Sequence, residues 1–136
     1  MDIYDQIRRD EGLRLKPYQD TVGKTTIGYG RNLSDKGISQ VEADFLLHND
    51  VEAVTNELQT RLPYFNALDP VRQAVLTNMA FNMGFNGLEG FSNMLRCVAL
   101  GDWTGAAAEM VDSVWSREVG PRATRLAEQM TSGQWM

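Results

Sequence analysis

The chain has 136 residues, of which 43% are hydrophobic and 23% are charged, with a formal net charge of -5 and one cysteine. This length and composition are typical of one folded domain and exclude a disordered or fibrous protein. The single Cys97 cannot form an intramolecular disulfide, and no stretch approaches the roughly 18 consecutive apolar residues of a transmembrane helix. Because the start also lacks a basic-then-apolar signal, we expect a soluble protein made in a reducing compartment.

The negative charge is concentrated in one central segment. Residues 1–36 carry a net charge of +1, residues 37–69 a net charge of -5, and the remainder a net charge of -1. A general nucleic-acid binder usually shows a strongly basic face, so we expect no nucleic-acid partner.

The chain is predicted to begin with a short helix that leads into a small sheet. Residues 3–11 place Ile3 and Ile7 on one helical face, and Gly12 follows at the usual position of a C-terminal cap. From residue 13 to 33, glycines and β-branched residues replace the helical spacing. This pattern predicts short strands joined by tight turns.

A long helix is predicted next, over residues 39–62. Ser39 and Glu42 form a capping box, in which each side chain satisfies a free backbone N–H of the first turn. Apolar residues then recur at largely helical spacing until Pro63 ends the run. Such a helix is roughly 33 Å long and can connect two lobes.

The remainder of the chain predicts several shorter helices. Asp69 and Pro70 have the pattern of an N-cap and a first helical residue. The helix that they begin is expected to reach Gly84, before a bend rich in glycine and asparagine. A further helix is expected at residues 92–100 and is closed by Gly101. Another runs through residues 106–111 with Asp102 as its cap, and the last runs from Pro121 to about residue 131.

Together these elements predict an α+β fold in a single domain, residues 1–136. We expect a small β-hairpin lobe at about residues 12–38, the connecting helix at 39–62, and a helical back lobe at 63–136. Helix 3–11 is expected to pack on the helical lobe.

Metal, nucleotide and cysteine chemistry find little support. His48 and Cys97 are the single residues of their types, too few for a zinc site, so we expect neither a metal nor any other cofactor. Gly28 and Gly30 have G-x-G spacing but lead into a loop rather than a helix, which argues against a dinucleotide site. Cys97 is expected in the core, and His48 as a partly exposed helix residue.

Carboxylates near the start of the chain are the remaining candidates for catalysis. Glu11 ends the first predicted helix, where the helix dipole disfavours negative charge, and Asp20 and Thr26 follow across the predicted strands. Two carboxylates facing a groove, one protonated and one ionised, are what acid-assisted glycosidic cleavage requires. Gly28 and Gly30 would let a bulky ligand approach the backbone. The alternative is that neither residue is catalytic: Glu11 is then only a charged residue at a helix end, and Asp20 only closes a turn.

Motifs in this region resemble the phage-type lysozymes, glycoside hydrolase family 24. They are Asp10-Glu11-Gly12-Leu13-Arg14-Leu15, Tyr18-x-Asp20-Thr21-x-Gly23 and Thr25-Thr26-Ile27-Gly28-x-Gly30. The similarity continues as far as Thr131-x-Gly133-x-Trp135 and so covers essentially the whole chain. It is similar to the T-even type, but the segment between Leu33 and Ser39 is shorter than in the longest members. We therefore expect a shorter front lobe.

This resemblance implies an endolysin, a muramidase that cuts the β-1,4 bond between N-acetylmuramic acid and N-acetylglucosamine in bacterial peptidoglycan. It implies that Glu11 is the general acid, and that Asp20 with Thr26 holds the attacking water. Direct attack by water inverts the anomeric carbon, which requires the two carboxyl groups to lie roughly 6.5–9.5 Å apart.

The resemblance also implies which residues bind the substrate. They are Gly28, Gly30, Phe81, Asn82, Trp115 and Arg122. Phe81 has an equally good alternative as a core aromatic. Arg31 stands where family members commonly have histidine, and a pair with Asp50 on the long helix is open to it.

The implied partner is peptidoglycan, with no nucleic acid, no stable membrane association and a monomeric protein. Such a protein would accumulate in the host cytoplasm and reach the cell wall through a separate membrane pore, a holin. Two alternatives stay open: a wall-binding structural module without catalysis, and a lytic transglycosylase, which cuts the same bond without water. The intact Glu11, Asp20 and Thr26 favour hydrolysis over both.

We predict that lysis depends only modestly on ionic strength. Residues 1–36 and 113–136 each carry a net charge of +1, so a groove that they line would present a nearly neutral face to an anionic wall. Raising the salt from about 10 mM to about 0.15 M should therefore change the initial rate of turbidity loss by no more than a few fold. A steep fall in rate over that range would contradict this prediction.

Overall fold

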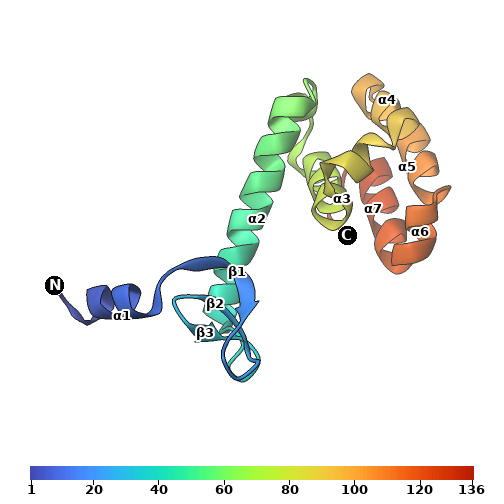
Figure 1. Ribbon diagram of the computed structural model, residues 1–136. Coiled ribbons are helices and arrows are strands. Elements are labelled where there is room, and N and C mark those ends of the chain that lie inside the picture. The colour runs from blue at the N-terminus through green and yellow to red at the C-terminus, as the bar shows by residue number, and fades with distance from the viewer. The chain divides into compact units, whose positions relative to one another are not determined.

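The computed structural model describes all residues from 1 to 136, and its elements are seven α-helices and one three-stranded antiparallel sheet (Figure 1). This confirms the α+β class. The contacts within the chain divide it into two units, Met1–Leu46 and Leu47–Met136. The predicted single domain, with helix 3–11 on the helical lobe, stays a prediction.

The first helix, α1 (Ile3–Glu11), has the predicted bounds and begins at a capping box. The Asp2 carboxylate accepts the backbone N–H of Asp5 at 2.9 Å, and the Asp5 carboxylate accepts that of Asp2 at 3.2 Å. Gly12 follows with φ 72°, and its N–H donates to the carbonyl of Arg8 at 3.0 Å. Glu11 is therefore held at the last position of a well-defined helix.

The sheet is a meander of three short strands, β1 (Arg14–Gln19), β2 (Thr25–Gly28) and β3 (Arg31–Asn32). In β2, Thr26 pairs with Tyr18 on one side and with Asn32 on the other. Thr26 is the one buried side chain in residues 1–46, with an exposed fraction of 4%. The predicted strands are confirmed, and Thr26 lies at the centre of the sheet.

The predicted long helix is α2 (Gln40–Arg61), and it begins at the predicted capping box. The Ser39 hydroxyl accepts the N–H of Glu42 at 3.1 Å, while Oε1 of Glu42 accepts the N–H of Ser39 at 2.8 Å. The helix ends before Pro63, whose ring cannot continue it.

The second unit is arranged around α3 (Pro70–Glu89), which Asp69 caps as predicted. Its buried side chains form the centre of an apolar core. The surrounding elements are a short 3-10 helix (Phe65–Ala67), α4 (Ser92–Leu100), α5 (Trp103–Val111), α6 (Val114–Val119) and α7 (Pro121–Ser132). Among them, α5 and α7 lie side by side (Figure 1).

Two parts of this unit differ from the sequence prediction. Gly84 does leave helical geometry, at φ 77° and ψ 164°, but the helix resumes at once and runs to Glu89 in place of the predicted bend. Helix α6 is absent from the predicted helices. The signal for it is Ser113, whose hydroxyl accepts the N–H of Ser116 at 3.0 Å as an N-cap.

Arg72 connects the start of α3 to the end of α7. Its Nε donates to the carbonyl of Met130 at 2.7 Å and its Nη2 to the carbonyl of Thr131 at 3.1 Å. The guanidinium also pairs with Asp69 at 3.2 Å and lies 4.2 Å from the centre of the Trp103 ring. Only 13% of the side chain is exposed, so this connection is largely shielded from water.

We predict that Arg72→Lys destabilises the protein by roughly 2 kcal/mol, because a compact ammonium lacks the planar fork that reaches two carbonyls and a carboxylate while its face lies on a ring. Urea unfolding monitored by circular dichroism measures the change. Arg96→Lys, at an exposed arginine, should change the free energy of unfolding by less than about 0.5 kcal/mol. Equal losses in the two variants would show that the connection contributes nothing specific.

Candidate active site

The Glu11 carboxylate lies against the backbone of Gly30. A Cβ atom at residue 30 would be 2.6 Å from Oε2 and 2.9 Å from Cδ of Glu11, so the carboxylate would have to move aside for it. Gly30 also has φ 75°, a region that residues with a Cβ rarely adopt. The space left by the missing side chain is therefore filled by the carboxylate, rather than being open to a ligand.

Asp20 lies in the turn between β1 and β2 and is held by the backbone of that turn. Its Oδ1 accepts the N–H of Val22 at 2.9 Å and that of Lys24 at 2.8 Å. The Oδ2 atom has no protein partner, and the residue is half-buried. Asp20 thus closes the turn with one oxygen and keeps the other available.

Thr26, on the neighbouring strand, presents a fixed acceptor. Its hydroxyl donates to the carbonyl of Lys24 at 3.0 Å, so the single proton is used within the protein. Two residues along, a Cβ on Gly28 would meet nothing within 4 Å, so the space beside this end of the strand is open. Five of the predicted site residues thus lie in the first unit, at the end of α1 and on the sheet.

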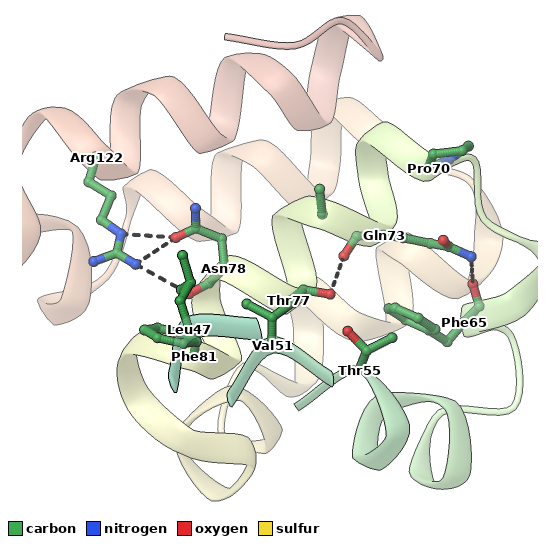
Figure 2. A pocket seen from close by; sticks show the side chains of 11 residues that line it. Leu47, Val51, Thr55, Phe65, Pro70, Gln73, Thr77, Asn78, Phe81 and Arg122 are labelled. Atoms are coloured by element: carbon green, nitrogen blue, oxygen red, sulfur yellow. Dashed lines mark hydrogen bonds between the residues drawn. The ribbon is translucent and has the colours of Figure 1, made fainter. Parts of the chain in front are cut away.

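The other four predicted residues lie in the second unit, and two of them line one pocket of about 490 Å³ (Figure 2). Phe81 is 42% exposed, so it forms a wall of this pocket and is not a core aromatic. Arg122 is held by Asn78, whose Oδ1 accepts Nε at 2.9 Å and Nη2 at 2.7 Å. Asn78 is not among the predicted site residues; its signal is a polar side chain one turn before Asn82 on the same helix.

Trp115 and Asn82 bind each other. The indole Nε1 of Trp115 donates to Oδ1 of Asn82 at 2.9 Å, and the ring meets Phe91 edge-on with centroids 6.0 Å apart. Trp115 is 7% exposed, whereas Asn82 is exposed. Trp115 also borders a second pocket of about 380 Å³. Substrate contact by either residue stays a prediction.

The partner of Arg31 is Glu42 and not Asp50. The guanidinium holds both carboxylate oxygens, with Nη2–Oε2 at 2.8 Å and Nη1–Oε1 at 2.9 Å, and Nη1 also donates to the carbonyl of Gly37 at 3.1 Å. The capping box explains this choice, because it already directs the Glu42 carboxylate back toward the loop after β3. Hydrogen bonds from Arg31, with support from Ser39, lower the pKa of Glu42 to about 2.

Other chemistries remain unsupported by the geometry. Burial raises the pKa of the Cys97 thiol, and the nearby Asp102 and Glu109 raise it further, so a reactive thiolate is disfavoured. No group of three or more histidine, cysteine, aspartate or glutamate side chains is placed to hold a metal ion. None of the helices has the length and apolar content needed to cross a bilayer.

Known proteins resemble this chain over nearly all of its length. The sequence model of the family described as Phage lysozyme matches residues 8–130. The chain is 30% identical to the pre-baseplate central spike protein Gp5 of Enterobacteria phage T4, over 98% of the chain but only 28% of that protein. It is 27% identical to the probable T4-type lysozyme 2 of Dictyostelium discoideum, over 96% of the chain and 94% of that protein. It is 35% identical to an endolysin of Acyrthosiphon pisum secondary endosymbiont phage 1, over 82% of the chain and 75% of that protein.

We predict that Gly30→Ala lowers the glycosidase activity expected of Glu11 at least about tenfold, because the new methyl group displaces the Glu11 carboxylate. The matched control is Gly101→Ala, where φ is 72° and the nearest atom lies at 3.8 Å. Both variants carry backbone strain of about 1–2 kcal/mol, so rates are compared at a temperature at which both are folded. Equal rates would show that the Glu11 position does not matter.

Proposed function

The chain belongs to the phage lysozyme family, and from this premise we propose that it hydrolyses the β-1,4 bond between N-acetylmuramic acid and N-acetylglucosamine of bacterial peptidoglycan. The observation that carries the proposal is the arrangement of two carboxylates in the first unit. Glu11 is held against Gly30, and Asp20 keeps Oδ2 free of protein partners. Cleavage of a glycosidic bond by inversion needs one such acid and one such base.

Glu11 is the general acid in this proposal. Its carboxyl group gives a proton to the bridging oxygen while the bond from the anomeric carbon to that oxygen breaks, and the leaving sugar departs as an alcohol. A water molecule forms the new bond to the anomeric carbon from the opposite face and loses a proton to Asp20. Exchange of protons with solvent then restores both residues, and the anomeric carbon is inverted.

Thr26 orients that water. Because its hydroxyl proton is committed to the carbonyl of Lys24, Thr26 can only accept a hydrogen bond from a water molecule. The Oδ2 atom of Asp20 is likewise an acceptor. A water that donates to both residues has its lone pair directed away from them, as attack on the sugar requires.

Residues of the second unit are proposed to hold the sugar chain. The exposed ring of Phe81 offers an apolar face for a sugar ring. Arg122 uses Nε and Nη2 on Asn78, which leaves Nη1 for an oxygen of the substrate. Gly28, Asn82 and Trp115 are assigned to substrate binding on the resemblance to the family.

We further propose that the protein acts as an endolysin, a monomer that reaches the cell wall through a separate membrane pore. The similarity to a protein named endolysin, over 75% of that protein's length, supports this role. The similarity to the spike protein is a second observation, and it favours a lysozyme module of a larger phage particle. Loss of lysis from within, in a phage that lacks this chain, would distinguish the first role from the second.

We predict that the protein releases muropeptides with hydrated reducing ends, as mass spectrometry of digested peptidoglycan would show. Glu11→Gln should reduce their release by about a hundredfold or more, because the amide cannot donate the catalytic proton. Glu118→Gln, at an exposed glutamate, is the matched control.

Each other outcome selects an alternative. Anhydro ends would identify a lytic transglycosylase, and binding to peptidoglycan without release would identify a wall-binding module. An undiminished rate in Glu11→Gln would remove Glu11 from the mechanism.

A further inference from the structure

The ion pair of Arg31 and Glu42 joins the end of the sheet to the start of α2. Both carboxylate oxygens of Glu42 accept from the guanidinium, and Oε1 accepts the N–H of Ser39 as well. The Arg31 side chain is 29% exposed, less than any other side chain that forms an ion pair in residues 1–46. Such a two-point contact fixes the orientation of the arginine as well as its distance.

Arg31 directly follows Gly30, the residue on which Glu11 rests. The strand that begins at Arg31 contains two residues, and its ladder to β2 consists of two paired positions. Just past the strand, the N–H of Leu33 donates to the carbonyl of Thr25 at 2.8 Å and keeps the chain on the sheet. The Arg31 side chain adds a contact of another kind, because through the Glu42 carboxylate and the carbonyl of Gly37 it ties the backbone next to Gly30 to the start of α2.

Glu11 itself has little else to hold it. Within residues 1–46 its carboxylate makes no hydrogen bond or ion pair, and its close neighbour is the Gly30 backbone. An unrestrained glutamate side chain at a helix end populates several rotamers, and holding it in one of them costs conformational entropy. Contact with the Gly30 backbone limits the rotamers that Glu11 can adopt.

We propose that the Arg31–Glu42 ion pair is a positioning device for the general acid: by anchoring β3, it keeps the Gly30 backbone against the Glu11 carboxylate. This inference rests on the role proposed for Glu11. Arg31 and Glu42 are positioning residues, since neither has to touch the substrate for the pair to act in this way.

The pair is also insensitive to pH near neutrality. Hydrogen bonds from Arg31 keep the pKa of Glu42 at about 2, and a guanidinium stays protonated throughout. The charged contact between Arg31 and Glu42 is therefore kept across the neutral range.

The test compares two glutamates on the same helix. Glu42→Gln removes the charge that holds Arg31, whereas Glu57→Gln removes the charge of an exposed pair with Arg61 at 3.4 Å, far along α2. On soluble peptidoglycan chains, at a temperature at which circular dichroism shows every protein folded, Glu42→Gln should lower kcat about tenfold. Its KM should stay close to that of the unmodified protein, because the substrate contacts are made by other residues, and Glu57→Gln should change neither constant.

A second measurement reports on Glu11 without turnover. The carboxyl carbon resonance of Glu11 in a carbon-13 spectrum, assigned by its disappearance in Glu11→Gln, should shift in Glu42→Gln and stay in place in Glu57→Gln. A Glu42→Gln variant that loses stability alone, with kcat and the Glu11 resonance unchanged, would overturn the inference. If the unmodified protein releases no reducing ends, the proposed function fails, and the resonance by itself decides whether the pair positions Glu11.

Discussion

The first unit has almost no apolar core, and this constraint governs how its site is built. Thr26 is the one buried side chain in residues 1–46, so directional polar contacts must hold the elements of this unit in place. Asp20 is fixed by two backbone N–H groups, Thr26 by a backbone carbonyl, and β3 by the fork of Arg31 on Glu42. Hydrogen bonds define geometry more sharply than apolar burial does, because their strength falls steeply with distance and angle.

The second unit, in contrast, is held together by a buried apolar core. Its core contains the fully buried Met79, Met94, Met110 and Met130, flexible side chains that fill irregular spaces between short helices. Helix α3 serves two purposes with two faces. Val75, Leu76, Met79 and Ala80 lie in the core, whereas Thr77, Asn78 and Phe81 line a pocket. Because a helix has 3.6 residues per turn, these two sets lie on different faces of α3. The helix that contributes to the core therefore also positions the pocket residues.

Much of the fold is predictable from the sequence because its signals are local. Caps at helix ends are made by hydrogen bonds between residues at most four positions apart. They begin helices at Asp2, Ser39 and Asp69 and end helices at Gly12 and Gly101, and in each case the helix begins or ends where predicted. The errors occur where local rules compete with packing. Gly84 adopts the non-helical geometry that a glycine favours, yet Phe85 and Leu88 are buried and the helix resumes to place them in the core.

Local patterns in the sequence are enough to place the ends of the main elements. They are also enough to find the residues that carry the resemblance to phage lysozymes, with Glu11, Asp20 and Thr26 among them. Which side chains meet one another depends on the three-dimensional arrangement of the elements. Gly30 makes room for the Glu11 carboxylate, Arg31 selects Glu42, and Trp115 binds Asn82. These partners lie 11 to 33 positions apart in the chain. Propensity and periodicity act over a few residues, whereas such pairs depend on where whole elements come to rest.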